Sequence, residues 1–241
     1  MTPVGIGVLL LLLALALLGV VFYREYRLKE QDRVLAEKKI ALLLSQIQPH
    51  FLYNILGSIE WLCETDPKKA QEATEQLSRF LRGNMDSLQS VTTIPAAREL
   101  EHIRCYLSLE AIRFGEKLHT VYDIETEDFF VPALGLQPLV ENAVRHGVTK
   151  REEGGTVSIR TCQTQWAYLV FIEDDGVGFD PAAPQEGSHL GIENVRSRLE
   201  AQCGGSLTVH SQPGVGTRVE VCIPKEWKRG RRNDHARFGG R

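Results

Sequence analysis

Apolar and polar positions follow three successive patterns along the chain, and each pattern predicts a different kind of structure. Residues 3–23 carry no charge and are dominated by leucine, valine and alanine. From there to Gly115, apolar side chains recur every three or four positions, which is typical of helices with one buried face. After Gly115, short runs rich in valine and isoleucine alternate with turn residues, which favours strands with a few helices between them.

The middle pattern predicts three helices that pack as a bundle. The first covers residues 43–63 and contains Pro49, which lacks a backbone donor and should bend or loosen the helix just before His50. Asp66 can cap the second helix and Pro67 fits its first turn, so this helix should run to about residue 88. The third begins near residue 95, with four apolar residues on its buried side: Leu100, Ile103, Leu107 and Ile112.

The last pattern predicts a two-layer α/β sandwich, so the whole chain falls in the α+β class. Strands are expected at residues 121–124, 157–159, 167–172, 207–209 and 219–223, and helices at about 134–147 and 190–202. Residues 180–188 are rich in proline, alanine, glycine and serine, which indicates a flexible loop between the two helices.

The uncharged run at residues 3–23 is long enough to cross a membrane as one helix. A secretory signal peptide is the competing interpretation, but a basic leader and an A-x-A cleavage site before Arg24 are both missing. Several basic residues follow the run, and the positive-inside rule then places the rest of the chain in the cytoplasm. We expect a single-pass anchor in the cell membrane and, with only Met1 and Thr2 before it, no extracellular sensing domain of its own.

Residues 24–44 read as a charged helix with leucines at seven-residue spacing: Leu28, Leu35 and Leu42. This spacing suits a short parallel coiled coil that would hold a homodimer together. A single solvated helix fits equally well, because the intervening positions are polar. The last seventeen residues, 225–241, hold seven lysines and arginines and read as a disordered basic tail, which either touches anionic lipid or is solvated without a role.

Composition narrows the function classes further. The chain has 241 residues with a formal net charge of −3, so no global basic field points to direct contact with nucleic acid. Its five cysteines are scattered, with no C-x-x-C pair, which suggests reduced thiols in a cytosolic domain and not a disulfide framework.

Polar residues that could hold a nucleotide follow the predicted strands and helices. Asp174 comes after an apolar strand and could accept a hydrogen bond from an exocyclic amine, while Gly176 and Gly178 would let the backbone approach a ligand closely. Glu141 and Asn142 share a short helix, where a carboxylate beside an amide oxygen suits Mg²⁺. Arg145, one turn further on, could face phosphate oxygens.

His50 offers a neutral imidazole near pH 7, which is a competent nucleophile for a phosphoryl group. A lone histidine beside Phe51 and Leu52 is more often a structural residue. The surrounding string QPHFLYN (residues 48–54) changes this balance.

Together with ENAVRHG (residues 141–147), DDGVG (174–178) and GVGT (214–217), that string resembles sensor histidine kinases of the LytS/YpdA type. The resemblance runs from about residue 43 to residue 224. It implies a phospho-acceptor at His50 and an ATP-binding domain of GHKL (Bergerat) type.

The resemblance also implies the role of each site residue. Asp174 would hold adenine, Asn142 would bind Mg²⁺, Arg145 would approach phosphate, and His146 would belong to the pocket scaffold. The residues 180–191 would form a lid that ends at Gly191, and the pocket edge would be shaped by Gly214, Gly216 and Thr217. Glu110 is a candidate general base, because no acidic residue directly follows His50.

Three positions depart from the pattern of this family. His189 replaces the first glycine at the end of the lid, where the backbone approaches phosphate. Gln48 and Gly57 each stand where an asparagine is usual, although neither change removes the chemistry.

These observations predict five parts: a membrane anchor (1–23), a signalling helix (24–42), a helical acceptor and dimerisation domain (43–116), an ATP-binding domain (117–224) and the basic tail (225–241). The expected function is that of a membrane-anchored two-component kinase. It would autophosphorylate with Mg-ATP and pass the phosphoryl group to a response regulator of LytTR or AraC output type. The alternative is a catalytically weak, nucleotide-binding dimeric protein that modulates another kinase.

Two further classes are disfavoured. An ATP-driven clamp of the gyrase or chaperone type would need large downstream domains, whereas the chain ends soon after the predicted ATP fold. A serine-kinase anti-sigma factor would lack both the apolar run and the QPHFLYN string. Kinship of fold would not separate these classes, so the acceptor string carries the distinction.

Overall fold

The computed structural model describes residues 17–20, 22–27, 29–30, 49–89, 93–180 and 189–226. The chain divides into two compact units, Met1–Leu52 and Tyr53–Arg241. In the first unit, the described residues before Pro49 are helical and exposed. The leucine repeat at 28, 35 and 42, the loop at 181–188 and the tail from 227 lie outside the described residues.

The predicted membrane span is described only in part, at residues 17–20 and 22–23. Among the helices that the structure describes, none combines the length and the apolar character that a membrane crossing requires.

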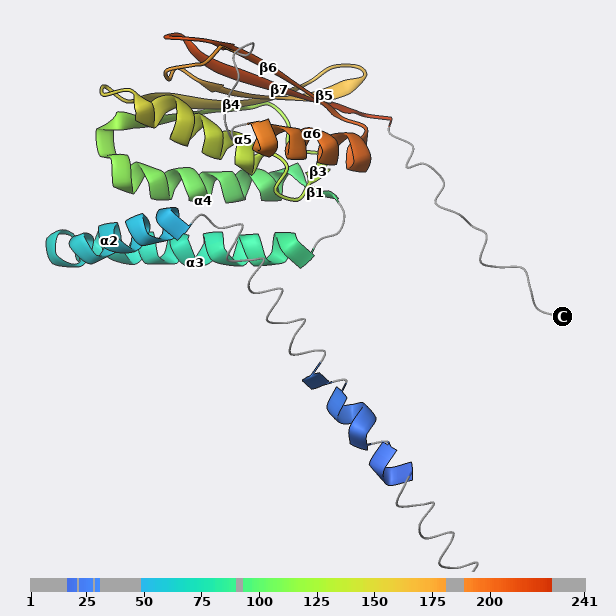
Figure 1. The fold of residues 1–241 in the computed structure, drawn as a ribbon. Helices are drawn as coiled ribbons and strands as arrows, with labels where there is room; N and C mark the ends of the chain where they lie inside the picture. Colours follow the sequence, from blue (N-terminus) through green and yellow to red (C-terminus); the bar gives the residue numbers. More distant parts are fainter. Residues whose placement is uncertain are drawn as a thin grey trace, which may run out of the picture. The chain divides into compact units, whose positions relative to one another are not determined.

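Three long helices make up the helical region: α2 (Pro49–Thr65), α3 (Pro67–Gln89) and α4 (Ala96–Phe114). The predicted start of α3 is confirmed, since an Asp66 side-chain oxygen accepts a hydrogen bond from the Lys69 backbone N–H at 3.1 Å. On α4, three of the four residues predicted to face inward are buried, and Ile112 is half-buried. α2 and α3 lie side by side (Figure 1), and Leu62, Ala70 and Ala73 form a small core between them.

A five-stranded sheet follows, in the order β2-β4-β5-β7-β6. Its strands are β2 (Leu118–Ile124), β4 (Gly155–Gln163), β5 (Ala167–Asp174), β6 (Ser206–Gln212) and β7 (Gly216–Pro224). β2 and β4 pair in parallel, and the other neighbours pair antiparallel. All five strands lie where the valine- and isoleucine-rich runs predict them.

Helices cover one face of this sheet, which confirms the two-layer sandwich (Figure 1). α5 (Gln137–Asn142) continues into a π-type turn, η2 (Ala143–Gly147), and a short 3-10 turn, η3 (Val148–Lys150). The predicted last helix is α6 (His189–Cys203), and the 3-10 turn η1 (Gly115–Lys117) joins α4 to β2. The core between the layers is aliphatic: β4, β5 and β7 supply Val157, Ile159, Val170, Ile172 and Val221, and the helices supply Leu139, Val140, Val195 and Leu199.

A second, two-stranded sheet ties the helical region to this sandwich. β1 (Thr93–Pro95), just before α4, pairs antiparallel with β3 (Phe130–Pro132), just before α5. α4 therefore packs against α3 and also contacts β2, β3 and α5. The predicted boundary between residues 116 and 117 remains a proposal, and these contacts cross it.

Candidate functional site

A cleft of about 530 Å³ opens between α5, η2, the end of β5, α6 and β7. Six of the residues predicted from the sequence line it: Asn142, Arg145, His146, Asp174, Gly178 and Thr217. Apolar side chains complete its walls, among them Leu139, Ile172, Ile192 and Val219. A concave, largely apolar site with a few converging polar groups is the usual form of a small-molecule site.

Asp174 ends β5 and is 9% exposed. Burial raises its pKa to about 6, although hydrogen bonds from Gly176 and Thr217 oppose the rise. Its Oδ1 accepts the Gly176 N–H at 3.0 Å. A carboxylate placed between apolar walls can accept a hydrogen bond from a ring amine while the walls pack against the flat ring.

Two glycines let the backbone close tightly behind Asp174. A Cβ atom added at Gly176 would collide with the backbone of Gly147, and one added at Gly147 would collide with the Asp174 carboxylate. A larger residue at 176 would therefore require the backbone to move, and one at 147 would displace the Asp174 carboxylate. Gly147 is the last residue of η2, so this contact fixes the turn that follows Asn142 against the end of β5.

The closing turn of the cleft lies between β6 and β7. Gly216 has a φ of 127°, and a Cβ atom there would collide with the Asp174 carbonyl oxygen. Gly214 donates its N–H to the Val177 carbonyl at 2.7 Å, which joins this turn to the segment after Asp174. Thr217 pairs with Asp174 in the sheet register and lies 2.9 Å from the Ser211 hydroxyl.

Asn142 ends α5 and lines the cleft, and a Cβ atom added at Gly191 of α6 would lie 3.9 Å from its side-chain nitrogen. The structure therefore brings the predicted lid end and the predicted magnesium ligand together. Arg145 and His146 are both exposed at the cleft. Desolvation by neighbouring atoms, with the charges of Arg145 and Lys150, lowers the pKa of His146.

Glu141 is not among the residues that line the cleft. Its carboxylate accepts a hydrogen bond from the Gln137 side chain at 2.6 Å. Burial raises its pKa to about 7, and the negative charges of Glu110 and Glu99 add to this rise. Glu141 therefore faces a buried acidic region beside α4, whereas its neighbour Asn142 faces the cleft.

Glu110 lies in that acidic region, on α4, and is 4% exposed. It accepts hydrogen bonds from the Tyr106 hydroxyl at 3.3 Å and from Arg113 at 3.5 Å. His50 is exposed in the first turn of α2 and belongs to the other compact unit. The assignment of Glu110 as the base for His50 stays a prediction.

Glu99 holds the turn that precedes α5, and the sequence reasoning did not identify this role. The side chain is 0% exposed. Its Oε1 accepts the N–H groups of Leu136 at 3.0 Å and Gln137 at 3.1 Å, and its Oε2 accepts the Leu134 N–H at 3.1 Å. The carboxylate thus fastens α4 to the first residues of α5 and positions Asn142 from a distance.

The sequence reasoning also missed two residues at the cleft itself. Phe179 lines it directly after the DDGVG string, and Gly147 closes it from behind. Gly147 is the last residue of the ENAVRHG string and Phe179 directly follows the DDGVG string, so these two strings were the available signal. Among the described residues, no group of three histidine, cysteine or acidic side chains is arranged to hold a metal.

Two known protein families match two consecutive regions of the chain. Residues 38–118 match the family described as histidine kinase, and residues 133–226 match the family described as histidine kinase-, DNA gyrase B- and HSP90-like ATPase.

Three relatives illustrate the similarity. The uncharacterised protein YwpD of Bacillus subtilis (strain 168) is 39% identical, over 79% of this chain and 74% of its own length. The sensor histidine kinase YpdA of Escherichia coli (strain K12) is 34% identical, over 82% of this chain and 36% of its own. The sensor protein LytS of Enterococcus faecalis (strain ATCC 700802 / V583) is 30% identical, over 87% and 38%. The chain therefore spans little more than a third of the two named sensor proteins.

Proposed function

Because the chain belongs to the sensor histidine kinases of the LytS/YpdA type, we propose that it binds Mg-ATP in the cleft and phosphorylates its own His50. The observation that carries this proposal is the meeting of Asp174, Asn142 and Arg145 in one cleft with apolar walls. In this proposal the Asp174 carboxylate accepts a hydrogen bond from the adenine amine. Arg145 pairs with phosphate oxygens, and the wall residues pack against the base.

Asn142 is the residue that fits a magnesium ion. Its amide oxygen is a hard donor of the kind that Mg²⁺ prefers, and this ion commonly takes one or two protein ligands together with substrate phosphates and water. When bound, Mg²⁺ would neutralise negative charge on the phosphates during transfer. Gly191, close to the Asn142 side chain, would let the start of α6 approach the same phosphates.

The phosphoryl step needs an imidazole nitrogen with a lone pair, aligned with the terminal phosphate. In the proposed reaction a nitrogen of His50 forms the bond to phosphorus while the bond from phosphorus to the ADP oxygen breaks. The remaining ring proton passes to a base, for which Glu110 is the proposed residue. The phosphoryl group then moves to an aspartate of a response regulator, with LytTR- or AraC-type output as the proposed classes.

Incubation of the full chain with γ-labelled ATP and Mg²⁺ tests this function. We expect covalent label that acid removes and alkali does not, because a phosphorus–nitrogen bond to imidazole has this stability. A chain that binds ATP and acquires no such label would contradict the proposal and favour a nucleotide-binding partner of another kinase.

Replacing Asp174 by asparagine should weaken ATP binding and reduce the preference for ATP over GTP. Loss of one charge-assisted hydrogen bond costs about 1.5–3 kcal/mol, or roughly 10- to 150-fold in affinity. The difference between wild type and variant should shrink as the pH falls through about 6, because Asp174 then loses its charge. Calorimetry of both proteins across this pH range measures these effects. The titration of ATP itself is the same for both proteins and therefore cancels in the ratio of their affinities.

Asp175→Asn is the matched control, since Asp175 is exposed, does not line the cleft, and uses its Oδ1 to accept the Thr156 N–H at 2.6 Å. It should leave ATP affinity within about twofold of wild type. Equal ATP affinity in wild type and Asp174→Asn would place the adenine contact elsewhere.

For the whole chain, we propose a single-pass anchor at residues 3–23, a cytoplasmic catalytic part and a homodimer. The support is the uncharged run followed by basic residues, together with the leucine spacing at 28, 35 and 42. A reporter fused after residue 241 should be active only if it functions in the cytoplasm. Activity of a reporter that works only outside the cytoplasm would contradict this topology.

A further inference from the structure

A second cleft, separate from the proposed nucleotide cleft, lies between α3 and α4. Its volume is about 220 Å³, which is smaller than the sites that hold drug-sized ligands. Three arginines line it: Arg79 and Arg82 from α3, and Arg98 from α4. None of the residues proposed to bind the nucleotide or to take part in phosphoryl transfer lines this second cleft.

The buried His102 also lines this cleft and is 6% exposed. Its ring stacks on Phe80 at 5.1 Å between centroids, and its Nε2 lies 3.0 Å from the Phe80 carbonyl oxygen. Gly83 makes room for the ring, because a Cβ atom there would lie 2.7 Å from a ring carbon. The imidazole is therefore held in one place by α3.

The other ring nitrogen of His102 defines what the cleft can bind. A carbonyl oxygen only accepts, so Nε2 carries the hydrogen that it donates to Phe80, and in the neutral ring Nδ1 bears a lone pair. Nδ1 is buried and has no hydrogen-bond partner within the described part of the chain. Buried polar atoms are normally paired, so a ligand with a hydroxyl group would complete this site once neighbouring side chains of the cleft move to uncover Nδ1.

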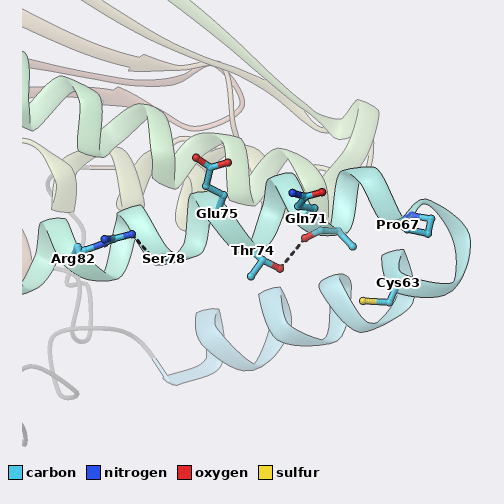
Figure 2. Close-up of a pocket in the computed structure, with 8 residues that line it drawn as sticks. Cys63, Pro67, Gln71, Thr74, Glu75, Ser78 and Arg82 are labelled. Carbon is cyan, nitrogen blue, oxygen red and sulfur yellow. Dashed lines mark hydrogen bonds between the residues drawn. The ribbon is translucent and has the colours of Figure 1, made fainter.

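The arginines supply positive charge around that acceptor. Arg82 donates one hydrogen bond to the Ser78 hydroxyl at 3.0 Å, as Figure 2 shows along the same helix, where Arg82 also borders a groove between α2 and α3. Arg79 pairs with Glu75 at 2.6 Å. A guanidinium has five N–H donors, so both arginines keep donors for a ligand. Arg98 has no ion pair with any residue that the structure describes.

Two acidic residues, Glu99 and Glu101, also line the cleft, and their negative charges would repel a bound anion. Both oxygens of Glu99 are engaged by backbone N–H groups, as described above. Glu101 is exposed on the rim, where water screens its charge. Three arginines therefore line the cleft, together with one buried, hydrogen-bonded carboxylate and one exposed carboxylate.

We propose that this cleft binds a phosphate group that still carries a proton, either as inorganic phosphate or as a phosphomonoester. The arginines pair with its charged oxygens, since guanidinium and phosphate geometries match. Its remaining hydroxyl donates to Nδ1 of His102. Sulfate has the same size and shape but no proton at neutral pH, so it leaves Nδ1 without a donor.

Titration of the full chain with inorganic phosphate and with sulfate, at neutral pH and constant ionic strength, tests the site. We expect phosphate to bind at least about tenfold more tightly than sulfate, because one buried hydrogen bond separates them. The Arg82→Ala/Arg98→Ala variant should lose at least about tenfold in phosphate affinity. Arg104 is an exposed arginine of α4 that stacks on the Tyr122 ring. The Arg104→Ala variant should change phosphate affinity by less than twofold.

A second experiment distinguishes a soluble phosphate from a lipid headgroup. It measures binding to phosphatidylcholine vesicles that contain or lack phosphatidic acid. Binding of free phosphate that the double variant removes supports a soluble ligand. Binding only to phosphatidic acid vesicles, also removed by the double variant, supports a lipid headgroup. Equal affinity for sulfate, phosphate binding that survives the double variant, or no binding in either experiment overturns the proposal.

Discussion

Replacing His50 by glutamine should remove all label that the chain acquires from γ-labelled ATP, while ATP affinity stays within about twofold of wild type. The glutamine amide keeps a polar group of similar size, but its nitrogen lone pair is delocalised and cannot attack phosphorus. His50 is exposed in the first turn of α2, so the substitution should not disturb a packed core. Labelling and calorimetry on the same preparation separate phosphoryl transfer from nucleotide binding.

His119→Gln is the matched control for that experiment. His119 is exposed on β2, in the ATP-binding part of the chain, and lacks the QPHFLYN context. Its variant should label at the wild-type rate. Undiminished acid-labile label in His50→Gln would show that another histidine takes the phosphoryl group, and loss of label in both variants would point to a shared defect in folding.

Much of the fold follows from local patterns. Every strand of the main sheet contains valine within a short strand-like run, and the cap at Asp66 is a short-range signal. The small sheet could not be predicted in the same way. β1 and β3 have three residues each and gain their hydrogen bonds only by pairing across 35 or more positions, which no local pattern records.

The cleft shows the same division between local and long-range information. Asp174, Asn142 and Arg145 stand in strings whose order along the chain predicts a common site, and all three line it. Glu141 stands next to Asn142, yet it faces Gln137 and the region of Glu110, because consecutive residues of a helix point in different directions. Which of the two neighbours faces the ligand depends on how α5 is rotated, and α4 sets that rotation.

Glu99 shows why a residue that supports the site is harder to predict than one that lines it. A charged residue in an amphipathic helix is expected to face water. Glu99 is instead fully buried, because its oxygens accept hydrogen bonds from backbone N–H groups of a turn some 35 residues away. Burial raises its pKa, and these hydrogen bonds oppose the rise. No sequence pattern indicates which backbone N–H groups will pair with this carboxylate and make its burial possible.

Replacing Glu99 by alanine should therefore destabilise the Tyr53–Arg241 unit strongly. The change leaves the buried N–H groups of Leu136 and Gln137, and the Leu134 N–H, without their acceptor. Leaving one such donor unsatisfied costs about 1–3 kcal/mol, so a loss of at least about 3 kcal/mol is expected after relief of the carboxylate's own desolvation. Glu99→Gln should cost less, because a single carbonyl oxygen can still accept from Leu136 and Gln137.

Urea denaturation followed by tryptophan fluorescence measures this loss, and Glu101→Ala is its control, since Glu101 lies on the same helix and is exposed. The control should stay within about 0.5 kcal/mol of wild type. Below the denaturation midpoint, Glu99→Ala should also bind ATP more weakly than Glu101→Ala, because α5 and Asn142 are no longer held against α4. If the two alanine variants unfold at the same urea concentration, the turn before α5 is held by the Arg198 bonds to the Ala133 and Leu134 carbonyls, and α4 does not position the nucleotide site.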